Sequence, residues 1–532
     1  MYLQTNFRLV EEVISSIDLG VIALYFVVVL TLGLWVARQT NSSEDLFLGG
    51  RSLTWGIIGF SLFASNISSS TIIGLTGAAY SSGIVQSVYE WISGIPLIIA
   101  ALVFVPLYLN AKITTIPEFL GQRFDRRSQV FFSVVTILTS ILVETAGGLY
   151  AGAIVLKTFF PNIVIWQTTL ALAFFAGIYT AFGGLKAVVY TDTLQALVLI
   201  LGSTVLTYTL FEQMDFSMEA VLAAAPEGHF SIYRPIGDST LPWPGLFLGV
   251  PLLGFWYWST NQYIVQRVLG AKDLKHARWG VLLGGFLKLI PLFIMVIPGA
   301  MAISLYQGIE NPDMVYPTIV VDALPTGLVG LVLAGLISAI MSSVDSTLNS
   351  SSTLVVVDFI QPKNPNLTAK QVLQYGRIST FVLMIIAAVW APMIENFGGI
   401  WVYLQQMYTI FVPPIVVLFL VGVFYPRGNG QGAFMTLTLG TFLGIAFFVF
   451  QQLGLWTVHF TITAGIIVGI SSLLFFAFSQ TAPAPSAEVI DRFTFKRALI
   501  NQDNEDLAWY QNYLYWALLL FLCIVALFFI LK

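Results

Sequence analysis

The sequence contains little cysteine, little histidine and little charge. Cys523 is the only cysteine in 532 residues, which excludes an internal disulfide and any metal site built from several cysteines. The three histidines, His229, His276 and His459, are widely separated and fall in loops or near the ends of apolar runs, so they indicate neither a zinc site nor a histidine acyltransferase site. No nucleophile–base pair is apparent either, and we expect no enzymatic activity.

Charged residues make up only 9% of the chain, whereas hydrophobic residues make up 57%. This balance lies far outside the composition of soluble proteins. Runs of roughly 20 apolar residues recur from residues 19–36 to residues 513–531, and each is long enough to cross a bilayer. The sequence therefore predicts an all-α polytopic membrane protein with about fourteen transmembrane helices. A cleavable signal peptide is not indicated, because the polar, acidic start precedes an apolar run of full span length.

Lys and Arg are concentrated in alternate loops along the chain. Such loops are expected to be cytoplasmic, which places both termini outside, as an even number of spans requires. We expect a multi-pass protein of a bacterial inner (cell) membrane that functions as a monomer in the lipid bilayer and has no nucleic-acid partner. The basic loops hold Arg38, Arg51, Lys112, Arg123, Arg126, Arg127, Lys186, Arg267, Lys272, Lys275, Arg278, Lys363, Lys370, Arg377, Arg427, Arg492, Lys496 and Arg497, and the other loops hold little beyond Arg8, Lys157, Arg234 and Lys532.

A polar stretch interrupts the second apolar run, between Ser61 and Gly74 (SLFASNISSSTIIG). Ser, Thr and Asn compete with the helical backbone for hydrogen bonds, which favours a broken helix. Non-helical backbone at membrane depth is tolerated where it is buried in protein or lines a watery cavity, and its free carbonyls can hold a cation. The alternative is a Ser-rich helix that packs closely on a neighbouring helix.

A second polar break follows about five spans later, near Tyr257–Gln262 (YWSTNQ). Paired interrupted helices in corresponding positions of two halves are typical of a transporter site, and five spans per half would make the halves inverted. The longest external loop, residues 212–243, contains an Ala-rich helical piece. The largest internal loop, residues 480–507, is rich in Ala, Pro and charge and is interpreted as a solvated linker before the last span.

Ionisable residues inside spans are costly, so each is a candidate for the site. Glu90 lies between Tyr89 and Trp91, where a carboxylate could accept hydrogen bonds from sugar hydroxyls while the aromatic faces cover C–H groups; the alternative is a structural ion pair with Lys288. Lys288 follows two glycines that would let a helix approach, although snorkelling to the membrane surface is the alternative. Glu395 lies less deep, and Glu144 has no role beyond an interior polar contact.

Residues 339–346 (AIMSSVDS) place Ala339, Ser342, Ser343 and Ser346 on one helical face, with Asp345 beside them. Hydroxyls, a carboxylate and backbone carbonyls are the hard oxygen ligands that an alkali cation requires, whereas the alternative is packing of small residues. Two further polar residues have equally balanced interpretations. Asp192 either ends a span or ligates a cation, and Gln405 either binds sugar hydroxyls or bonds a neighbouring helix.

These motifs together resemble the solute:sodium symporter family, specifically its sodium–glucose cotransporter branch, over nearly the whole length. The motifs are Ala64–Ser68 (ASNIS), Tyr89–Trp91 (YEW), Tyr190–Gln195 (YTDTLQ), Leu241–Gly245 (LPWPG), Trp256–Trp258 (WYW), Asn261–Arg267 (NQYIVQR), Phe286–Leu289 (FLKL), and Ser342–Ser343 with Leu348–Ser350 (LNS). The resemblance implies the LeuT-type inverted repeat of five helices, with broken first and sixth core helices.

The domain organisation follows from this implied fold. It comprises an extra helix and loop (1–52), the first repeat (53–212), an external loop (213–243), the second repeat (244–424), and peripheral helices (425–532) that include the cytoplasmic linker (480–510).

The resemblance also implies the ion sites. The sodium site would use backbone carbonyls of Ala64, Ile67 and Ala339 with the hydroxyls of Ser342 and Ser343. A candidate second sodium site would consist of Asp192, Ser342, Asp345 and Ser346. Asp345 stands where relatives usually carry a small or hydroxyl residue; it could strengthen this second site, carry a proton, or share one with Asp192. One or two Na⁺ ions are therefore expected as coupling ions.

The resemblance also implies a sugar site and the gates on its two sides. The sugar would contact Asn66, Ser70, Thr71, Glu90, Ser93, Trp258, Lys288 and Gln405. Tyr257 matches the inner gate, and Leu75, Tyr89 and Trp401 fall where the outer gate lies. Thr71 and Gly254 depart from the sugar-transporting pattern, because each replaces a longer or polar side chain and leaves room for water or a larger substrate.

The sequence predicts sodium-coupled import of a neutral sugar, such as a hexose, by alternating access. An inositol, a sialic acid or a monocarboxylate is the alternative substrate. Anions usually require an arginine in the site, and none is apparent at membrane depth, which favours a neutral solute. A sugar sensor that does not transport is the alternative from another class, but the chain shows no signalling domain and keeps the serine pair of the sodium site.

Overall fold

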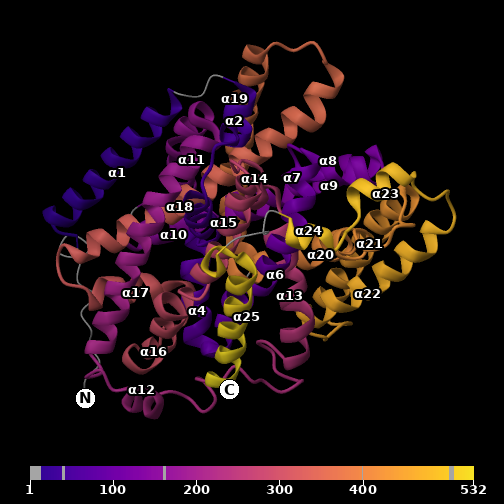
Figure 1. Cartoon of the computed structure of the whole chain (residues 1–532). Coiled ribbons are helices and arrows are strands. Elements are labelled where there is room, and N and C mark those ends of the chain that lie inside the picture. Colours follow the sequence, from indigo (N-terminus) through magenta and orange to yellow (C-terminus); the bar gives the residue numbers. More distant parts are fainter. Residues whose placement is uncertain (1–13, 39–41, 160–162, 398–399, 503–507) are drawn as a thin grey trace.

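The computed structural model describes residues 14–38, 42–159, 163–397, 400–502 and 508–532, and within these ranges the chain is almost entirely helical (Figure 1). The first half contains α1 (Ser16–Ala37), α2 (Ser43–Leu48), α3 (Trp55–Asn66), α4 (Ser69–Ser82), α5 (Val88–Trp91), α6 (Gly94–Ile99), α7 (Val105–Ala111), α8 (Ile116–Arg123), α9 (Arg126–Leu138), α10 (Ala146–Phe159), α11 (Ile165–Glu212) and α12 (Met218–Ala224). The second half contains α13 (Trp243–Ser259), α14 (Gln262–Leu269), α15 (Leu274–Leu287), α16 (Ile297–Leu305), α17 (Val315–Ala323), α18 (Leu328–Leu354), α19 (Ala369–Trp390), α20 (Ile400–Leu420), α21 (Gly430–Gln452), α22 (Phe460–Ser479), α23 (Ala487–Phe493), α24 (Ala498–Asn501) and α25 (Tyr513–Ile530).

Short 3₁₀ and π segments join these helices. The 3₁₀ segments are η2 (Gly49–Arg51), η3 (Ile84–Ser87), η7 (Pro312–Met314), η9 (Gln361–Lys363), η10 (Ala391–Phe397) and η11 (Trp509–Gln511). The π segments are η4 (Ala100–Phe104), η5 (Thr139–Thr145), η6 (Leu292–Val296) and η8 (Val355–Ile360). Insertions of this kind inside long helices often mark functional positions.

The described residues contain 11 helices long and apolar enough to cross a membrane, or up to 12 when α3 and α4 count as one bent span. The expected number of about fourteen is therefore not reached by length and composition. Two segments account for the difference: α13 has only 17 residues, and the first part of α11 includes residues whose side chains are not described. The all-helical membrane class is nevertheless clear.

Helix α11 is continuous over 48 residues, and its part Leu185–Glu212 is a candidate membrane span. Near its start, Thr169 donates a hydrogen bond to the carbonyl of Ala388, close to the end of α19. Leu185 packs with Leu53 in the cluster beside α3. Further along, Thr207 contacts the carbonyl of Phe293 in η6. At 1.5 Å per residue, the 48 helical residues are longer than twice the thickness of a bilayer core.

The two predicted helix breaks are both present. The first separates α3 from α4, which are bent by 59° at Ile67–Ser68. Ile67 has ψ of 74°, outside the helical range, and Ser68 is extended and caps α4 through its hydroxyl. The second separates α13 from α14 at Thr260–Asn261, where Asn261 is extended and precedes the first residue of α14. The polar residues of both stretches therefore interrupt helices, as expected.

The segments flanking the two broken helices meet at one place. Leu53, just before α3, forms an isolated parallel bridge with Ala271, just after α14. The Leu53 amide donates to the Gly270 carbonyl at 3.1 Å, and the Lys272 amide donates to the Leu53 carbonyl at 3.0 Å. This pairing ties together the ends of α3 and α14 that lie away from the breaks, so that the two helices lie side by side.

Helix α18 forms the centre of the bundle and packs along α11, α1, α19 and α3 (Figure 1). Small residues allow helices to approach closely, as in other membrane bundles. At Gly299 of α16, an added Cβ would lie 2.4 Å from the carbonyl oxygen of Thr76 in α4. The outer half of the first broken helix is thereby held against α16.

The segment after α22 differs from the expected solvated linker. It contains α23 and α24, and Phe493 is 3% exposed with its ring packed edge-on against Phe119 at 5.6 Å. Arg278 donates to the carbonyls of Leu499 and Gln502. A buried aromatic side chain and a buried arginine hold this segment on the helical bundle, which its Ala, Pro and charge content did not indicate.

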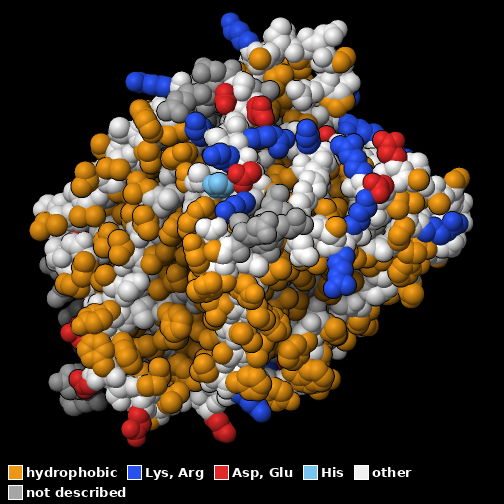
Figure 2. Space-filling model, viewed as in Figure 1, with side chains coloured by type: hydrophobic (Ala, Val, Ile, Leu, Met, Phe, Trp, Pro, Cys, Tyr) orange, Lys and Arg blue, Asp and Glu red, His pale blue; other side chains and the backbone are white. Residues whose placement is uncertain are grey.

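Lys and Arg side chains gather at one end of the molecule, and the surface beyond them is mainly hydrophobic (Figure 2). Exposed hydrophobic residues are numerous on the outer helices, including Leu24 and Val27 of α1, Val389 of α19, and Phe529 of α25. The C-terminal end of α25 lies at the opposite end from the basic side chains (Figures 1 and 2). This distribution is typical of a multi-pass membrane protein.

Candidate functional site

A cavity of about 120 Å³ lies between the two helix breaks. The eight residues predicted to contact the solute all line it: Asn66, Ser70, Thr71, Glu90, Ser93, Trp258, Lys288 and Gln405. The broken helices α3–α4 and α13 thus contribute to the same site as α5, α20 and Lys288, which directly follows α15.

A buried ion pair forms one wall of the cavity. The Lys288 ammonium contacts both the Glu90 carboxylate and the Asn66 side-chain oxygen, and it lies 5.5 Å from the centre of the Trp258 ring. The side chains of Lys288 and Glu90 are 1% and 6% exposed. Lys288 is therefore directed into the protein and does not snorkel. The pair is electrically neutral, while its oxygens and ammonium hydrogens present both acceptors and donors to the cavity.

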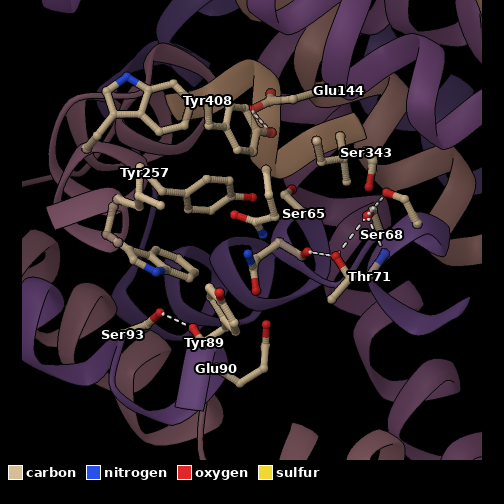
Figure 3. Close-up of a pocket in the computed structure, with 18 of the residues that line it drawn as sticks. Ser65, Ser68, Thr71, Tyr89, Glu90, Ser93, Glu144, Tyr257, Ser343 and Tyr408 are labelled. Carbon is tan, nitrogen blue, oxygen red and sulfur yellow. Dashed lines mark hydrogen bonds between the residues drawn. The ribbon is translucent and has the colours of Figure 1, made fainter. Parts of the chain in front are cut away.

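The hydroxyl groups of the first break bond to one another. The Ser68 hydroxyl lies 2.7 Å from that of Ser70 and 3.0 Å from that of Thr71. The Thr71 hydroxyl also donates to the Asn66 carbonyl at 3.1 Å, across the break (Figure 3). Thr71 therefore stabilises the non-helical turn, and its short side chain does not extend across the cavity. Gly254, the other departure from the sugar pattern, also lines the cavity.

Of the predicted gate residues, Tyr257 and Tyr89 line the cavity and Leu75 does not. Tyr257 lines the cavity, and its hydroxyl is hydrogen-bonded to that of Tyr263 in α14. Tyr89 lines the cavity next to Ser93, whose hydroxyl donates to the Tyr89 carbonyl at 2.9 Å. Leu75 is fully buried in α4 but does not line the cavity. The side chain of Trp401 lies outside the described residues.

The residues of the predicted sodium site lie where α18 meets the first break. The Ser343 hydroxyl donates to the Ala339 carbonyl at 2.9 Å and keeps its lone pairs for another partner. The Ser342 hydroxyl donates to Asp192 Oδ1 at 2.6 Å. Ala64 and Ile67, whose carbonyls were predicted to coordinate the ion, are buried at the end of α3. The donors present are hard oxygens, which is the chemistry that Na⁺ requires.

The predicted second ion site contains an unexpected arginine. Arg267 of α14 is fully buried, and its Nη2 lies 3.1 Å from Asp192 Oδ2 and also contacts the hydroxyls of Ser65 and Ser346. Its Nε donates to the Ser61 hydroxyl at 2.7 Å. Arg267 was counted among the basic loop residues, but the structure places it in α14, whose residues are all buried.

Asp345, the remaining residue of the predicted second ion site, is fully buried in α18. Met341, four residues earlier in α18, packs with Tyr25 and Val29 of α1. An aspartate four residues further along a helix lies on the same side. Asp345 is therefore on the side of α18 that faces α1.

Glu144 is a site residue for which the sequence predicted no role beyond an interior polar contact. It belongs to η5 and lines the cavity (Figure 3). Its Oε1 accepts hydrogen bonds from Asn261 Nδ2 and the Tyr408 hydroxyl, both at 3.0 Å. In the sequence, Asn261 belonged to the second polar stretch and to the motif Asn261–Arg267, without a role of its own.

The model of the sodium:solute symporter family matches residues 46–440 of this sequence. The chain belongs to the sodium:solute symporter family. It is therefore a sodium-coupled symporter and a multi-pass membrane protein, as the motifs indicated. The match covers both broken helices, the cavity and the serine pair of α18.

Several relatives are similar over most of the chain. Sodium/glucose cotransporter 1 of Mus musculus is 35% identical over 479 residues, covering 82% of this chain and 72% of the relative. Sodium/glucose cotransporter 4 of Danio rerio is 33% identical, covering 90% and 80% respectively. Sodium/myo-inositol cotransporter 2 of Oryctolagus cuniculus is 32% identical, covering 90% and 78%.

Solved structures agree on the fold. A Na⁺-coupled sialic acid symporter in a substrate-bound outward-open state superposes with a TM-score of 0.79 at 22% identity, covering 88% of this chain and 99% of that one. Mhp1, a nucleobase-cation-symport-1 family transporter, superposes in a closed conformation with a TM-score of 0.56 at 14% identity, covering 85% and 98%. These likenesses confirm the inverted-repeat fold that the two breaks predicted.

Proposed function

We propose that this symporter couples the inward movement of sodium to the import of a neutral polyhydroxylated solute, a hexose or a closely related polyol such as an inositol. The observation that carries the proposal is the neutral Lys288–Glu90 pair beside Asn66 in the cavity. Hydroxyl groups both donate and accept hydrogen bonds, and this pair offers partners for both without excess charge. The aromatic residues Tyr89, Tyr257 and Trp258 offer surfaces for C–H groups.

An anionic solute is the second candidate, and the buried arginine is the reason to weigh it. Arg267 is engaged by Asp192, Ser61, Ser65 and Ser346 and does not line the cavity. Lys288 is similarly neutralised by Glu90. With both cations paired, an added carboxylate in the cavity would bring an uncompensated negative charge. The neutral solute is therefore the better fit.

The mechanism begins with sodium binding from outside at the junction of α3 and α18. The carbonyls of Ala64, Ile67 and Ala339 and the hydroxyls of Ser342 and Ser343 would coordinate the ion. Cation binding there holds the first break against α18 and orders Asn66 and Ser70 beside the solute. The helical bundle then rocks, Tyr257 moves aside, and both solutes leave towards the cytoplasm, with both chain termini outside.

The number of ions determines how far the solute can be concentrated. One charge crossing about 100 mV gains roughly 2.3 kcal/mol. At about 1.4 kcal/mol per tenfold, voltage alone then supports roughly 45-fold accumulation, and a second ion roughly 2000-fold. Counting the ions therefore distinguishes a one-sodium from a two-sodium transporter.

Uptake into proteoliposomes tests the proposal. Labelled hexoses, inositols, sialic acid and carboxylates would be offered with an inward sodium gradient and again with potassium in its place. We expect sodium-dependent accumulation of one neutral sugar or polyol, lost in Glu90→Ala and in Ser343→Ala and retained in the exposed control Glu310→Ala. Accumulation of an anion with failure of every neutral solute would overturn the substrate class, and binding of a sugar without accumulation would indicate a sensor.

A further inference from the structure

Glu144 is the second carboxylate that lines the cavity, and its surroundings differ from those of Glu90. Glu90 is paired with Lys288, and Asp192 is paired with Arg267. The partners of Glu144 in the described structure are only the neutral groups of Asn261 and Tyr408. No Lys, Arg or His among the described residues forms an ion pair with it.

Both hydrogen bonds reach the same oxygen of Glu144. Asn261 and Tyr408 donate to Oε1 at 3.0 Å each, while Oε2 is buried and accepts no hydrogen bond within the described part of the chain. A buried carboxylate oxygen without a partner is costly, and the cost is greatest when the group is charged. A cation or a hydrogen-bond donor bound at Oε2 of Glu144 would offset this cost.

Asn261 also has a buried oxygen without a hydrogen-bond partner in the described part of the chain. Its side chain is 1% exposed, and its Oδ1 accepts no hydrogen bond from the described residues. The amide orientation follows from Glu144, because a carboxylate accepts hydrogen bonds and the NH₂ group must face it. Two adjacent side chains from η5 and from the second helix break therefore each keep one buried acceptor oxygen free.

The neighbouring groups are also oxygens. Thr347 and Ser343 of α18 line the same cavity, and their hydroxyls donate to backbone carbonyls, which leaves their lone pairs available. Thr347 is also 2.5 Å from the hydroxyl of Thr145, the residue after Glu144. A carboxylate, an amide oxygen and hydroxyls are hard donors that suit an alkali cation.

From these contacts we propose that Glu144 and Asn261 form a monovalent-cation subsite at the Tyr408 side of the cavity, separate from the Asp192 cluster. It takes Na⁺ in the cavity that Ser343 also lines. In Figure 3, Tyr257 lies between Glu144 and Tyr408 on one side and Glu90 and Ser93 on the other. In this view, Glu144 and Glu90 therefore lie on opposite sides of Tyr257.

This inference rests on the proposed sodium coupling, but its test does not require transport. Equilibrium binding of radioactive sodium would be measured on purified full-length protein without solute, with potassium as the competing ion. Glu144→Gln keeps the shape of the side chain and removes its charge, and Glu310→Gln makes the same change on the exposed surface. We expect Glu144→Gln to lose one bound ion per chain, or to bind it at least tenfold more weakly, and Glu310→Gln to match the unmodified protein.

A second readout uses the fluorescence of Trp256, whose ring lies 4.9 Å from that of Tyr408. Because Tyr408 also bonds Glu144, sodium binding there should change the Trp256 signal, and Trp256→Phe identifies that signal. Asn261→Leu, which removes the amide oxygen, should also raise the sodium concentration needed for half of the change at least tenfold. Thermal unfolding would verify that each variant is folded.

The outcomes separate this inference from the proposed function. Unchanged sodium binding in folded Glu144→Gln overturns the subsite, whatever the transport result. Unchanged sodium binding together with weakened solute binding assigns Glu144 to the solute and also overturns it. Failure of every sugar to accumulate, with sodium binding lost in Glu144→Gln, contradicts the proposed substrate and supports the subsite.

Discussion

Arg267 and Asp192 form an ion pair in which both side chains are fully buried, with Nη2 3.1 Å from Oδ2. The pair joins α14, in the inner half of the second broken helix, to α11. Four serines of α3 and α18 also contact the pair: Ser61, Ser65, Ser342 and Ser346. A tethered cation thus lies where the sequence analysis placed only oxygen ligands for a second sodium.

Removing only one partner of this pair should be more damaging than removing both. Arg267→Met leaves Asp192 buried without a cation, which costs about 3–5 kcal/mol in comparable buried pairs. We expect a large fall in Tm for Arg267→Met and substantial recovery in the double variant Arg267→Met/Asp192→Asn. Thermal unfolding in detergent measures both.

The exposed pair Arg127–Asp125 supplies the control. Arg127→Met should change stability by no more than about 1 kcal/mol. If the single and double variants at Arg267 and Asp192 are equally unstable, charge compensation is not the reason for the pair. A rise in the Tm of Arg267→Met with sodium but not potassium would show that an ion can replace the guanidinium.

Lys288 should control solute affinity more than sodium affinity. Lys288→Met removes the ammonium that contacts Glu90 and Asn66 and leaves a buried carboxylate unpaired. Losing hydrogen bonds to a charged group costs about 1.5–3 kcal/mol, which corresponds to a roughly ten- to hundredfold weaker solute affinity. Calorimetric titration of solute at saturating sodium measures it, and an unchanged affinity would remove the pair from the solute site.

Gly83 should tolerate no side chain. Its φ is +83° and its ψ −166°, a region that is essentially restricted to glycine, and an added Cβ would lie 2.0 Å from the His229 carbonyl oxygen. Gly83→Ala should therefore displace the external loop from the end of α4, where the Ile84 amide donates to the same carbonyl at 2.9 Å.

Limited proteolysis of residues 212–243 reports this displacement. Gly237→Ala is the matched control, because no atom lies within 4 Å of an added Cβ there. Cleavage should accelerate in Gly83→Ala and remain unchanged in Gly237→Ala. Equal cleavage of both variants would contradict the prediction.

Docking of the external loop should weaken in acid through His229. Burial lowers the pKa of His229 below its usual value of 6.5, and the nearby Arg234 lowers that pKa further. Because the folded pKa lies below the unfolded one, the docked loop is most stable above about pH 6.5, where the ring is neutral in both states. Its stability falls as the pH drops through this value, because the undocked ring then takes up a proton that the buried ring resists.

Hydrogen exchange of the loop at pH 7.5 and pH 5 tests this dependence. Exchange should rise in acid for the unmodified protein, and the rise should be smaller in His229→Gln. His276→Gln is the control, because His276 lies in the first turn of α15, outside the loop. Its ring contacts Asp273 at 2.8 Å. A rise in exchange that is unaffected by His229→Gln would assign it to another group.

The membrane class, the two helix breaks and the family could all be predicted from the sequence. Long apolar runs are a local property, and so is a polar stretch such as Ser65–Thr71 that competes with helical hydrogen bonds. The family motifs also identified Lys288, Glu90 and Asn66, which the structure brings together in one cavity. Their roles in binding remain predictions.

Only the tertiary structure decided which charges meet. Arg267 lies 75 positions from Asp192, and Asn261 lies 117 positions from Glu144. The positive-inside rule assigns an arginine near the end of a span to a loop, because it counts residues along the chain. It contains no information on the packing that buries α14. Partners so far apart in sequence are selected by the packing of α14 against α3 and α18, and no local pattern encodes that packing.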